Sequence, residues 1–380
     1  MSKRNANYDL LKILAMFGII LFHHFGNKIP NNFVELTDGF TTNSYFYDFI
    51  NNIPGGVSKV SLLMDFCYCH FGNGGNYIFM LVTGYFLFGR EISFPKRVHK
   101  VAGVLYAILF HGIVLTIIHF ATMKIFYPFS SYEEFKPLFR LPNWFSEKNL
   151  WYLQVYGLFI LLIIPLLKKF ENKLDKKTHL CIAFTLIFIN FLSYTEWLPN
   201  IWISDRLVEF SMCYYLGGYF SKYNVKIESK KLIIALLVYL ISFFLYQYYW
   251  RYTCSIIYEK PSDYSYVAVS APFVFCIVFS SICFLLFNNM VFTHAFSGKI
   301  LSNVASSTIG IYIFHYNLVQ LSSLIANEVW WHDWSRNGYF VFALIDTVIL
   351  FILGLLIDKI RKCTYKLIEK KVAGSIISGF

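Results

Sequence analysis

Long apolar stretches separated by short polar and basic segments run through this chain from end to end. A helix needs about 20 mostly apolar residues to cross a bilayer. Ten stretches approach or reach that length: residues 10–26, 72–88, 101–122, 149–167, 179–195, 204–221, 232–250, 266–287, 304–325 and 339–357. The second and the sixth are the least regular, because glycine and polar residues interrupt them. The pattern predicts an all-α integral membrane protein, a bundle of about ten transmembrane helices.

The basic residues between the stretches predict the orientation of the bundle. If the N-terminus lies inside, the inner segments hold more than twice as many lysines and arginines as the outer loops. Cytoplasmic loops carry such an excess, so both the N- and C-termini are expected in the cytoplasm. Lys12 interrupts the first stretch and no small-residue cleavage site follows, which indicates a retained helix rather than a signal peptide. Residues 1–380 are interpreted as a single membrane domain with no fused soluble domain.

Composition supports a membrane protein and excludes several other classes. Only 14% of the residues are charged, against about 25% in ordinary soluble domains, whereas 57% are hydrophobic and 20% aromatic. These values exclude disorder, coiled coil, collagen and a disulfide scaffold. The net charge of +11 lies in short tracts between apolar stretches, which is typical of a cytoplasmic membrane face and not of nucleic-acid binding.

The eight cysteines predict no metal site. Cys67, Cys69 and His70 form a single C-x-C-H cluster, and no second cluster supplies the remaining ligands that zinc requires. Most of the cysteines lie in apolar stretches and are interpreted as buried thiols.

Ionisable residues inside the predicted helices are the first functional candidates, because their insertion is costly. Lys12 and His23 are eleven residues apart, so they share one helix face about 16 Å apart along the axis. This face offers a cation near the cytoplasm and a proton acceptor towards the outside. His24 points about 100° away from His23. The alternative is structural: Lys12 reaches the inner headgroups, and His23 makes a hydrogen bond to another helix.

A basic tract follows the second stretch and offers an anion site. Arg97 and Lys100 lie three residues apart, on one face of a helix expected to begin at Pro95. Two cations at the inner surface can hold a polyphosphate. The alternative is plain positive-inside topology.

The remaining candidates are polar or aromatic residues in later stretches: Trp151, Tyr152, Arg206, Tyr312 and His315. Taken singly, the aromatic residues also suit an interfacial belt. Arg206 lies beside Asp205 and Glu209, so the alternative for it is an ion pair formed within the protein. His315 also suits a structural hydrogen bond.

Taken together and in this order, these motifs resemble membrane-bound acyltransferase family 3, the polysaccharide O-acyltransferases. The resemblance spans residues from about 8 to 357. Its parts are Lys12 and His23 with ten residues between them, Arg97-x-x-Lys100 in place of Arg-x-x-Arg, the run 79–85 ending in Thr83-Gly84-Tyr85, Trp151-Tyr152-Leu153, and Gly310-Ile311-Tyr312-x-x-His315. Lys100 keeps the positive charge of the family's second arginine but lacks its bidentate fork.

The resemblance implies transfer of an acyl group, usually acetyl, from cytoplasmic acyl-CoA to a hydroxyl of a cell-surface or secreted polysaccharide or a lipid-linked glycan. It implies acetyl-CoA as a substrate with no bound cofactor. The Lys- and Phe-rich composition suggests a bacterial source, and with it a location in the plasma membrane of a bacterium. His23 is then the general base or a transient acyl carrier, and Lys12, Arg97 and Lys100 bind the acyl-CoA. Tyr152 or Tyr312 is a candidate oxyanion donor.

Two other classes of function remain open. A transporter or flippase of a lipid-linked oligosaccharide would also have about ten helices and intramembrane charge, although the inverted repeats common in secondary transporters are not found in this sequence. It predicts no transferase activity in the pure protein. A catalytically silent membrane scaffold predicts that His23→Ala leaves any phenotype intact.

Overall fold

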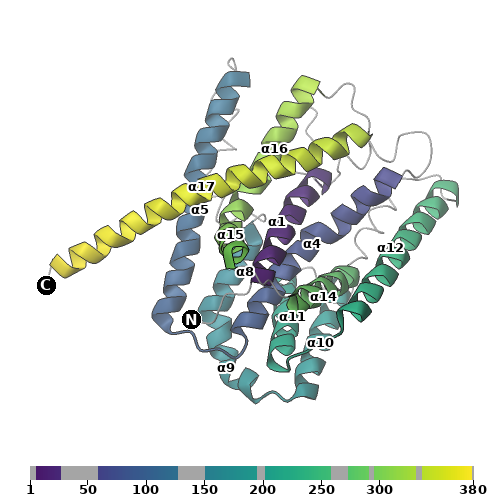
Figure 1. The fold of residues 1–380 in the computed structure, drawn as a ribbon, viewed down its shortest axis with the longest axis horizontal. Coiled ribbons are helices and arrows are strands. Elements are labelled where there is room, and N and C mark those ends of the chain that lie inside the picture. The colour runs from purple at the N-terminus through teal and green to yellow at the C-terminus, as the bar shows by residue number, and fades with distance from the viewer. Residues whose placement is uncertain are drawn as a thin grey trace.

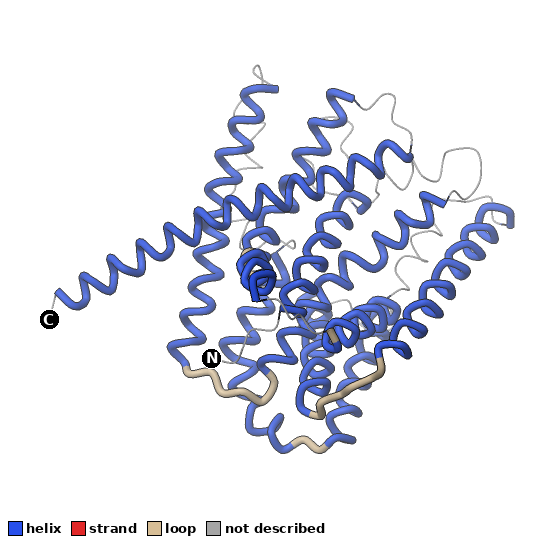
Figure 2. Tube along the Cα trace, viewed as in Figure 1, coloured by secondary structure: helices blue, strands red, loops and turns tan. Residues whose placement is uncertain are grey.

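The computed structural model describes residues 6–26, 59–126, 150–194, 202–257, 273–290, 295–330 and 336–378. Within these ranges the regular structure is helical and no strand occurs (Figure 1, Figure 2), which confirms the predicted all-α class. The elements are α1 (Ala6–Gly26), α4 (Lys59–Leu87), α5 (Phe94–Phe126), α8 (Trp151–Leu158), the π-helical η3 (Phe159–Ile163), α9 (Ile164–Lys173), α10 (Lys176–Tyr194), α11 (Trp202–Lys222), α12 (Ser229–Ile257), α14 (Phe273–Asn289), α15 (Ala295–Ala305), α16 (Thr308–Trp330) and α17 (Arg336–Ser378).

Each predicted stretch overlaps a helix, although residues 266–272 of the eighth lie outside the described part of the chain. The structure adds α15, which at 11 residues is too short for the length criterion. α17 runs on to Ser378, and its C-terminal part lies away from the other helices (Figure 1). Five described segments are long and apolar enough to cross a membrane: Ala6–Phe25, Phe94–Thr122, Trp151–Lys173, Ser229–Tyr246 and Phe340–Leu367. The total of ten spans and the cytoplasmic termini remain predictions.

α1 lies at the centre of the bundle. It contacts α4 most extensively and also packs against α14, α15, α16 and α17 (Figure 1). The buried side chains of α1 include Met16, Ile19 and Ile20, each 1% exposed or less. A central position explains why the polar residues of α1 face protein rather than lipid.

α4 and α11 approach each other so closely that each requires a glycine. A Cβ added at Gly84 would lie 2.2 Å from the carbonyl oxygen of Tyr214, and one added at Gly217 would lie 2.2 Å from that of Leu81. A backbone oxygen cannot move aside without disturbing its helix. Small residues at such interfaces let membrane helices pack backbone to backbone, and here they fix α4 against α11.

Large apolar side chains cover the outward faces of several helices. Ile117 of α5, Phe184 of α10, Leu245 of α12 and Ile345 of α17 are all exposed. In water such extensive apolar surface would cause association. On a helix bundle of this composition it is the surface that contacts lipid tails.

Candidate active site

A cavity of about 530 Å³ lies inside the bundle, between α1, α4, α5, α8 and the junction of α15 with α16. We call it the central cavity. Its described lining residues are Lys12, Phe79, Val82, Thr83, Phe86, Leu87, Lys100, Tyr152, Leu153, Tyr156, Ala305, Ser306, Thr308, Ile309 and Tyr312. Two lysines supply positive charge, and most of the other residues are aliphatic or aromatic. A ligand with both a negatively charged part and an apolar part matches this lining.

Lys12 reaches the central cavity from α1 and is held in place by an acidic residue. Its Nζ lies 2.9 Å from Oδ1 of Asp9, whose side chain is 2% exposed. Residues three apart are neighbours on a helix, so the pair is formed within α1 itself. Sequence analysis missed Asp9, although an acid three residues before an intramembrane lysine is the signal that identifies such a pair.

The two members of the basic tract have different surroundings. Lys100 lines the central cavity, whereas Arg97 is not among the described residues that line it. The Nη1 of Arg97 donates a hydrogen bond to the carbonyl oxygen of Leu161 in η3, at 2.8 Å. Pro165, four residues after Leu161, has no N–H with which to make the usual helical bond to that carbonyl. Arg97 therefore supplies a donor that the neighbouring helix lacks, and this ties α5 to η3.

The rings of His23 and His315 pack against each other, with their centroids 4.9 Å apart. His315 is only 3% exposed, and its Nδ1 donates to the carbonyl oxygen of Tyr312 at 2.6 Å. A neutral histidine that donates from Nδ1 keeps its lone pair on Nε2. This Nε2 is buried and has no hydrogen-bond partner among the described residues. The pair is therefore suited to accept and pass on a proton.

Tyr312 connects the histidine pair to the central cavity. Its ring centroid lies 5.4 Å from that of His315 and 5.6 Å from that of Tyr152, and both tyrosines line the cavity. The ring contacts therefore run from Tyr312 in the cavity wall through His315 to His23. Lys12 lines the same cavity as Tyr312, so the structure brings these sequence-predicted residues into one region.

His24 lies on another side of α1 and has different partners. Its Nε2 is 3.2 Å from Oδ2 of Asp346 in α17, and the Oγ of Ser322 in α16 donates to the same oxygen at 2.6 Å. His24 and Asp346 are 1% and 7% exposed. One buried carboxylate thus joins α1, α16 and α17. Sequence analysis missed Asp346, which is the only acidic residue in the stretch 339–357.

Arg206 and Trp151 lie beside the tyrosines that line the cavity. The guanidinium carbon of Arg206 lies 4.5 Å from the Trp151 ring centroid, and the ring of Trp151 is 6.1 Å from that of Tyr152. Nη1 of Arg206 is 2.9 Å from both carboxylate oxygens of Glu209, which is fully buried. The structure confirms that Arg206 is paired with Glu209; the side chain of Asp205 lies outside the described part.

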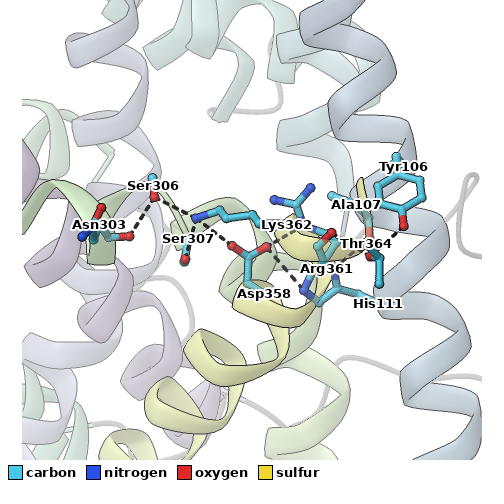
Figure 3. A network of polar contacts seen from close by, with 10 residues as sticks. All are labelled: Tyr106, Ala107, His111, Asn303, Ser306, Ser307, Asp358, Arg361, Lys362 and Thr364. Carbon is cyan, nitrogen blue, oxygen red and sulfur yellow. Dashed lines mark hydrogen bonds and ion pairs between the residues drawn. The ribbon is translucent and has the colours of Figure 1, made fainter. Parts of the chain in front are cut away.

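Another buried carboxylate, Asp358 of α17, organises a polar network beside the cavity (Figure 3). Arg361 Nε lies 2.6 Å from its Oδ1, and Lys362 Nζ lies 3.1 Å from its Oδ2. Lys362 also donates to the hydroxyls of Ser306 and Ser307, both at 2.7 Å, and Ser306 lines the central cavity. The network anchors the α15–α16 junction to α17. Sequence analysis missed Asp358, which lies one residue beyond the predicted stretch 339–357, although Arg361 and Lys362 follow it at three and four residues on the same helix.

The described residues offer no set of metal ligands. No three His, Cys, Asp or Glu side chains meet in that part of the chain as the ligands of an ion would. Instead, the Nε2 of His70 is hydrogen-bonded to the hydroxyl of Tyr239, and its Nδ1 donates to the carbonyl oxygen of Phe66 at 2.9 Å. His70 is therefore a buried hydrogen-bonding residue within an aromatic cluster.

A comparison with known families identifies the family of the chain. The family model of the acyltransferase domain of acyltransferase family 3 matches residues 5–356. The chain belongs to acyltransferase family 3. The match covers nearly the whole chain, so the acyltransferase is a helical membrane protein whose family carries out acyl transfer. No curated protein and no solved structure matches it significantly.

Proposed function

We propose that this acyltransferase moves an acetyl group from cytoplasmic acyl-CoA to a hydroxyl of a cell-surface or secreted polysaccharide, at the plasma membrane of a bacterium. The observation that carries the proposal is the series of ring contacts from Tyr312, which lines the same cavity as Lys12, through His315 to His23. It joins a cavity with positive charge to a pair of histidines. Family membership supports acyl transfer, and the identities of donor, acyl group and acceptor rest on the resemblance of the motifs.

The chemistry requires a base near the thioester. In a direct transfer His23 takes the proton of the acceptor hydroxyl, the oxygen attacks the thioester carbon, and a C–O bond replaces the C–S bond. The proton then passes to the departing thiolate, so the products are an ester and free CoA. His315, whose ring packs against that of His23 and whose Nε2 is buried, would share this proton. In the two-step alternative, His23 first carries the acyl group itself.

The other predicted residues take positions around this reaction. Lys12 and Lys100 would hold the donor from the wall of the central cavity. Arg97, three residues before Lys100 on α5, donates to the carbonyl oxygen of Leu161 and would hold α5 in place beside them. Tyr152 or Tyr312 would donate to the developing oxyanion. Trp151 and Arg206, beside Tyr152, would contact the acceptor sugar.

The proposal is tested with purified protein. Wild type in detergent, given acetyl-CoA and the host glycan, should release free thiol and form an alkali-labile ester. His23→Ala should lower turnover by about 10²–10⁴-fold, and Lys12→Gln should raise the KM for acetyl-CoA with a smaller change in kcat. Wild-type protein that folds but forms no ester with any acyl-CoA would contradict the proposal.

A measurement on cells separates transfer from transport. The ester-linked acyl content of the surface polysaccharide is measured by NMR, before and after mild alkali, in a deletion strain complemented with wild type or with His23→Ala. Loss of the ester with an unchanged amount of polymer supports the acyltransferase. Loss of the polymer itself, restored by His23→Ala, would instead indicate a transporter.

A further inference from the structure

A second cavity, of about 590 Å³, lies next to the central cavity at the start of α5. Its described lining residues are Phe86, Leu87, Arg90, Glu91, Ile92, Pro95, Lys96, His99 and Lys100. Phe86, Leu87 and Lys100 line both cavities. The two cavities are therefore adjacent, with Lys100 at their boundary, and we call the second one the basic cavity.

The basic cavity carries uncompensated positive charge. The side chains of Arg90, Lys96 and Lys100 make no hydrogen bond or ion pair with any residue that the structure describes. The acidic lining residue Glu91 is paired with Lys168 of α9 at 2.7 Å, and this ion pair lowers the pKa of the Glu91 carboxyl. Since the charge of Glu91 is already matched, three cations remain around the cavity.

The cations predicted from sequence are in a different state. Lys12 is paired with Asp9 at 2.9 Å, and Arg97 donates to the carbonyl oxygen of Leu161 at 2.8 Å. Asp9 matches the charge of Lys12, whereas the carbonyl takes only one donor of Arg97, whose Nε is buried without a hydrogen-bond partner in the described part of the chain. Position separates Arg97 from Arg90 and Lys96, because Arg97 is not among the described lining residues of either cavity. On this criterion Arg90 and Lys96 are better anion ligands than Arg97.

We infer that the basic cavity binds the phosphate groups of the donor's nucleotide head, with Arg90, Lys96 and Lys100 as ligands, and that Arg97 positions α5 rather than contacting the donor. The inference rests on the proposed function. CoA joins a mostly uncharged pantetheine arm to a nucleotide that carries a diphosphate and a further 3′-phosphate. The apolar central cavity takes the arm, Phe86 and Leu87 contact it at the junction, and the basic cavity takes the phosphates.

Positive-inside topology alone places lysines on this side of the membrane, but it does not direct them to one cavity. Lys222 shows the ordinary arrangement: its Nζ donates to the carbonyl oxygens of Glu171 and Leu174, at 2.8 and 2.7 Å, near the end of α9. Lys226 is exposed and is not among the described lining residues of either cavity. It provides a matched control, because replacing it removes the same charge from the same predicted face.

The test measures CoA binding by calorimetry on full-length protein in zwitterionic detergent, with CoA and dephospho-CoA, which lacks the 3′-phosphate, as probes. Arg90→Gln and Lys96→Gln should each weaken CoA binding by about tenfold. The double variant should lose the preference of wild type for CoA over dephospho-CoA. Lys226→Gln should bind both probes like wild type.

Three results would overturn the inference. Unchanged CoA affinity in the double variant would show that Arg90 and Lys96 do not contact the donor, while leaving the proposed function intact. A wild-type protein that binds no CoA at all would remove the proposed donor as well. Competition for the site by phosphatidylglycerol in nanodiscs, but not by 3′,5′-ADP, would assign the basic cavity to lipid headgroups instead.

Discussion

Replacing Gly310 with alanine should destabilise the acyltransferase and disturb its site through a single added methyl group. A Cβ at this position would lie 2.2 Å from Oδ1 and 2.6 Å from Cγ of Asp358. The carboxylate has no room to retreat, because Asp358 is fully buried and is held by Arg361 at 2.6 Å and by Lys362 at 3.1 Å. Either α16 moves away from α17 or the carboxylate leaves one of its cations.

The magnitude follows from these two costs. Overpacking a tight core typically costs about 1–3 kcal/mol, and depriving a buried charge of its partner costs about 3–5 kcal/mol. Alanine returns about 1 kcal/mol through its higher helix propensity. We therefore expect Gly310→Ala to lower the free energy of unfolding by about 2–4 kcal/mol if the carboxylate leaves a cation, and by less than about 2 kcal/mol if α16 moves instead. Because Tyr312 and His315 lie on the same helix, a shift of about 1 Å should also lower kcat by up to about 10²-fold.

The assay compares two glycines at the same interface. Gly354 of α17 also faces α16, but a Cβ there would lie 3.2 Å from its nearest neighbour, the Cγ1 of Ile311. Gly354→Ala gains the same helix propensity without a severe clash, so its thermal midpoint in detergent should stay near that of wild type. Gly310→Ala should melt earlier and turn over more slowly at saturating donor.

Two results would refute the reasoning. The first is a Gly310→Ala protein with the thermal midpoint and kcat of wild type. The second comes from the Asp358→Ala background, where the clashing carboxylate is gone and Gly310→Ala should cost little. Additive costs of the two substitutions would show that the methyl group acts elsewhere, because residues in contact are expected to couple.

Three further predictions concern the histidines, the basic tract and acid stability. His23→Ala should abolish turnover with normal expression, whereas His24→Ala should mainly lower the thermal midpoint; an essential His24 with a dispensable His23 would contradict the assignment. Arg97→Ala should lower the free energy of unfolding by about 1 kcal/mol, because the carbonyl oxygen of Leu161 loses a donor. A fall in CoA affinity with an unchanged thermal midpoint would instead place Arg97 in the binding site. Asp175 accepts hydrogen bonds from Lys177 N and from Thr178 at the start of α10, which lowers its pKa. This stability is present above the ordinary carboxyl value near 3.8 and is lost as pH falls through the lowered pKa; Asp175→Asn should therefore show a smaller acid-induced fall in thermal midpoint than wild type.

The helices were predictable because the physical requirement on them is local. A stretch of about 20 apolar residues with basic residues at its ends leaves a chain in lipid few alternatives to a helix. The same holds for the pairing of positions on α1: eleven residues bring Lys12 and His23 to one face whatever the neighbours are. α15 was missed for the complementary reason, since its 11 residues satisfy no length requirement.

The partners of the site were not predictable, because they come from helices far apart in the sequence. Asp346 meets His24 across 322 positions of the chain, and Asp358 meets the α15–α16 junction through Lys362. Nothing in the apolar stretch 339–357 indicates which helix its one carboxylate will face. The sequence shows that placing the carboxylate of Asp346 inside the membrane is costly. Only the packing of the helices shows that His24 is the partner that offsets this cost.

The basic tract shows where reasoning from spacing fails even within one helix. A separation of three residues places Arg97 and Lys100 on neighbouring positions of one face, yet the choice of partner depends on the helix opposite. Pro165 leaves Leu161 O without its usual helical donor, and the long, rigid guanidinium of Arg97 reaches it. Lys100, one turn further on, meets no such acceptor among the described residues and lines both cavities instead. Pro165 in α9 thus influences which cation of α5 remains available to a ligand.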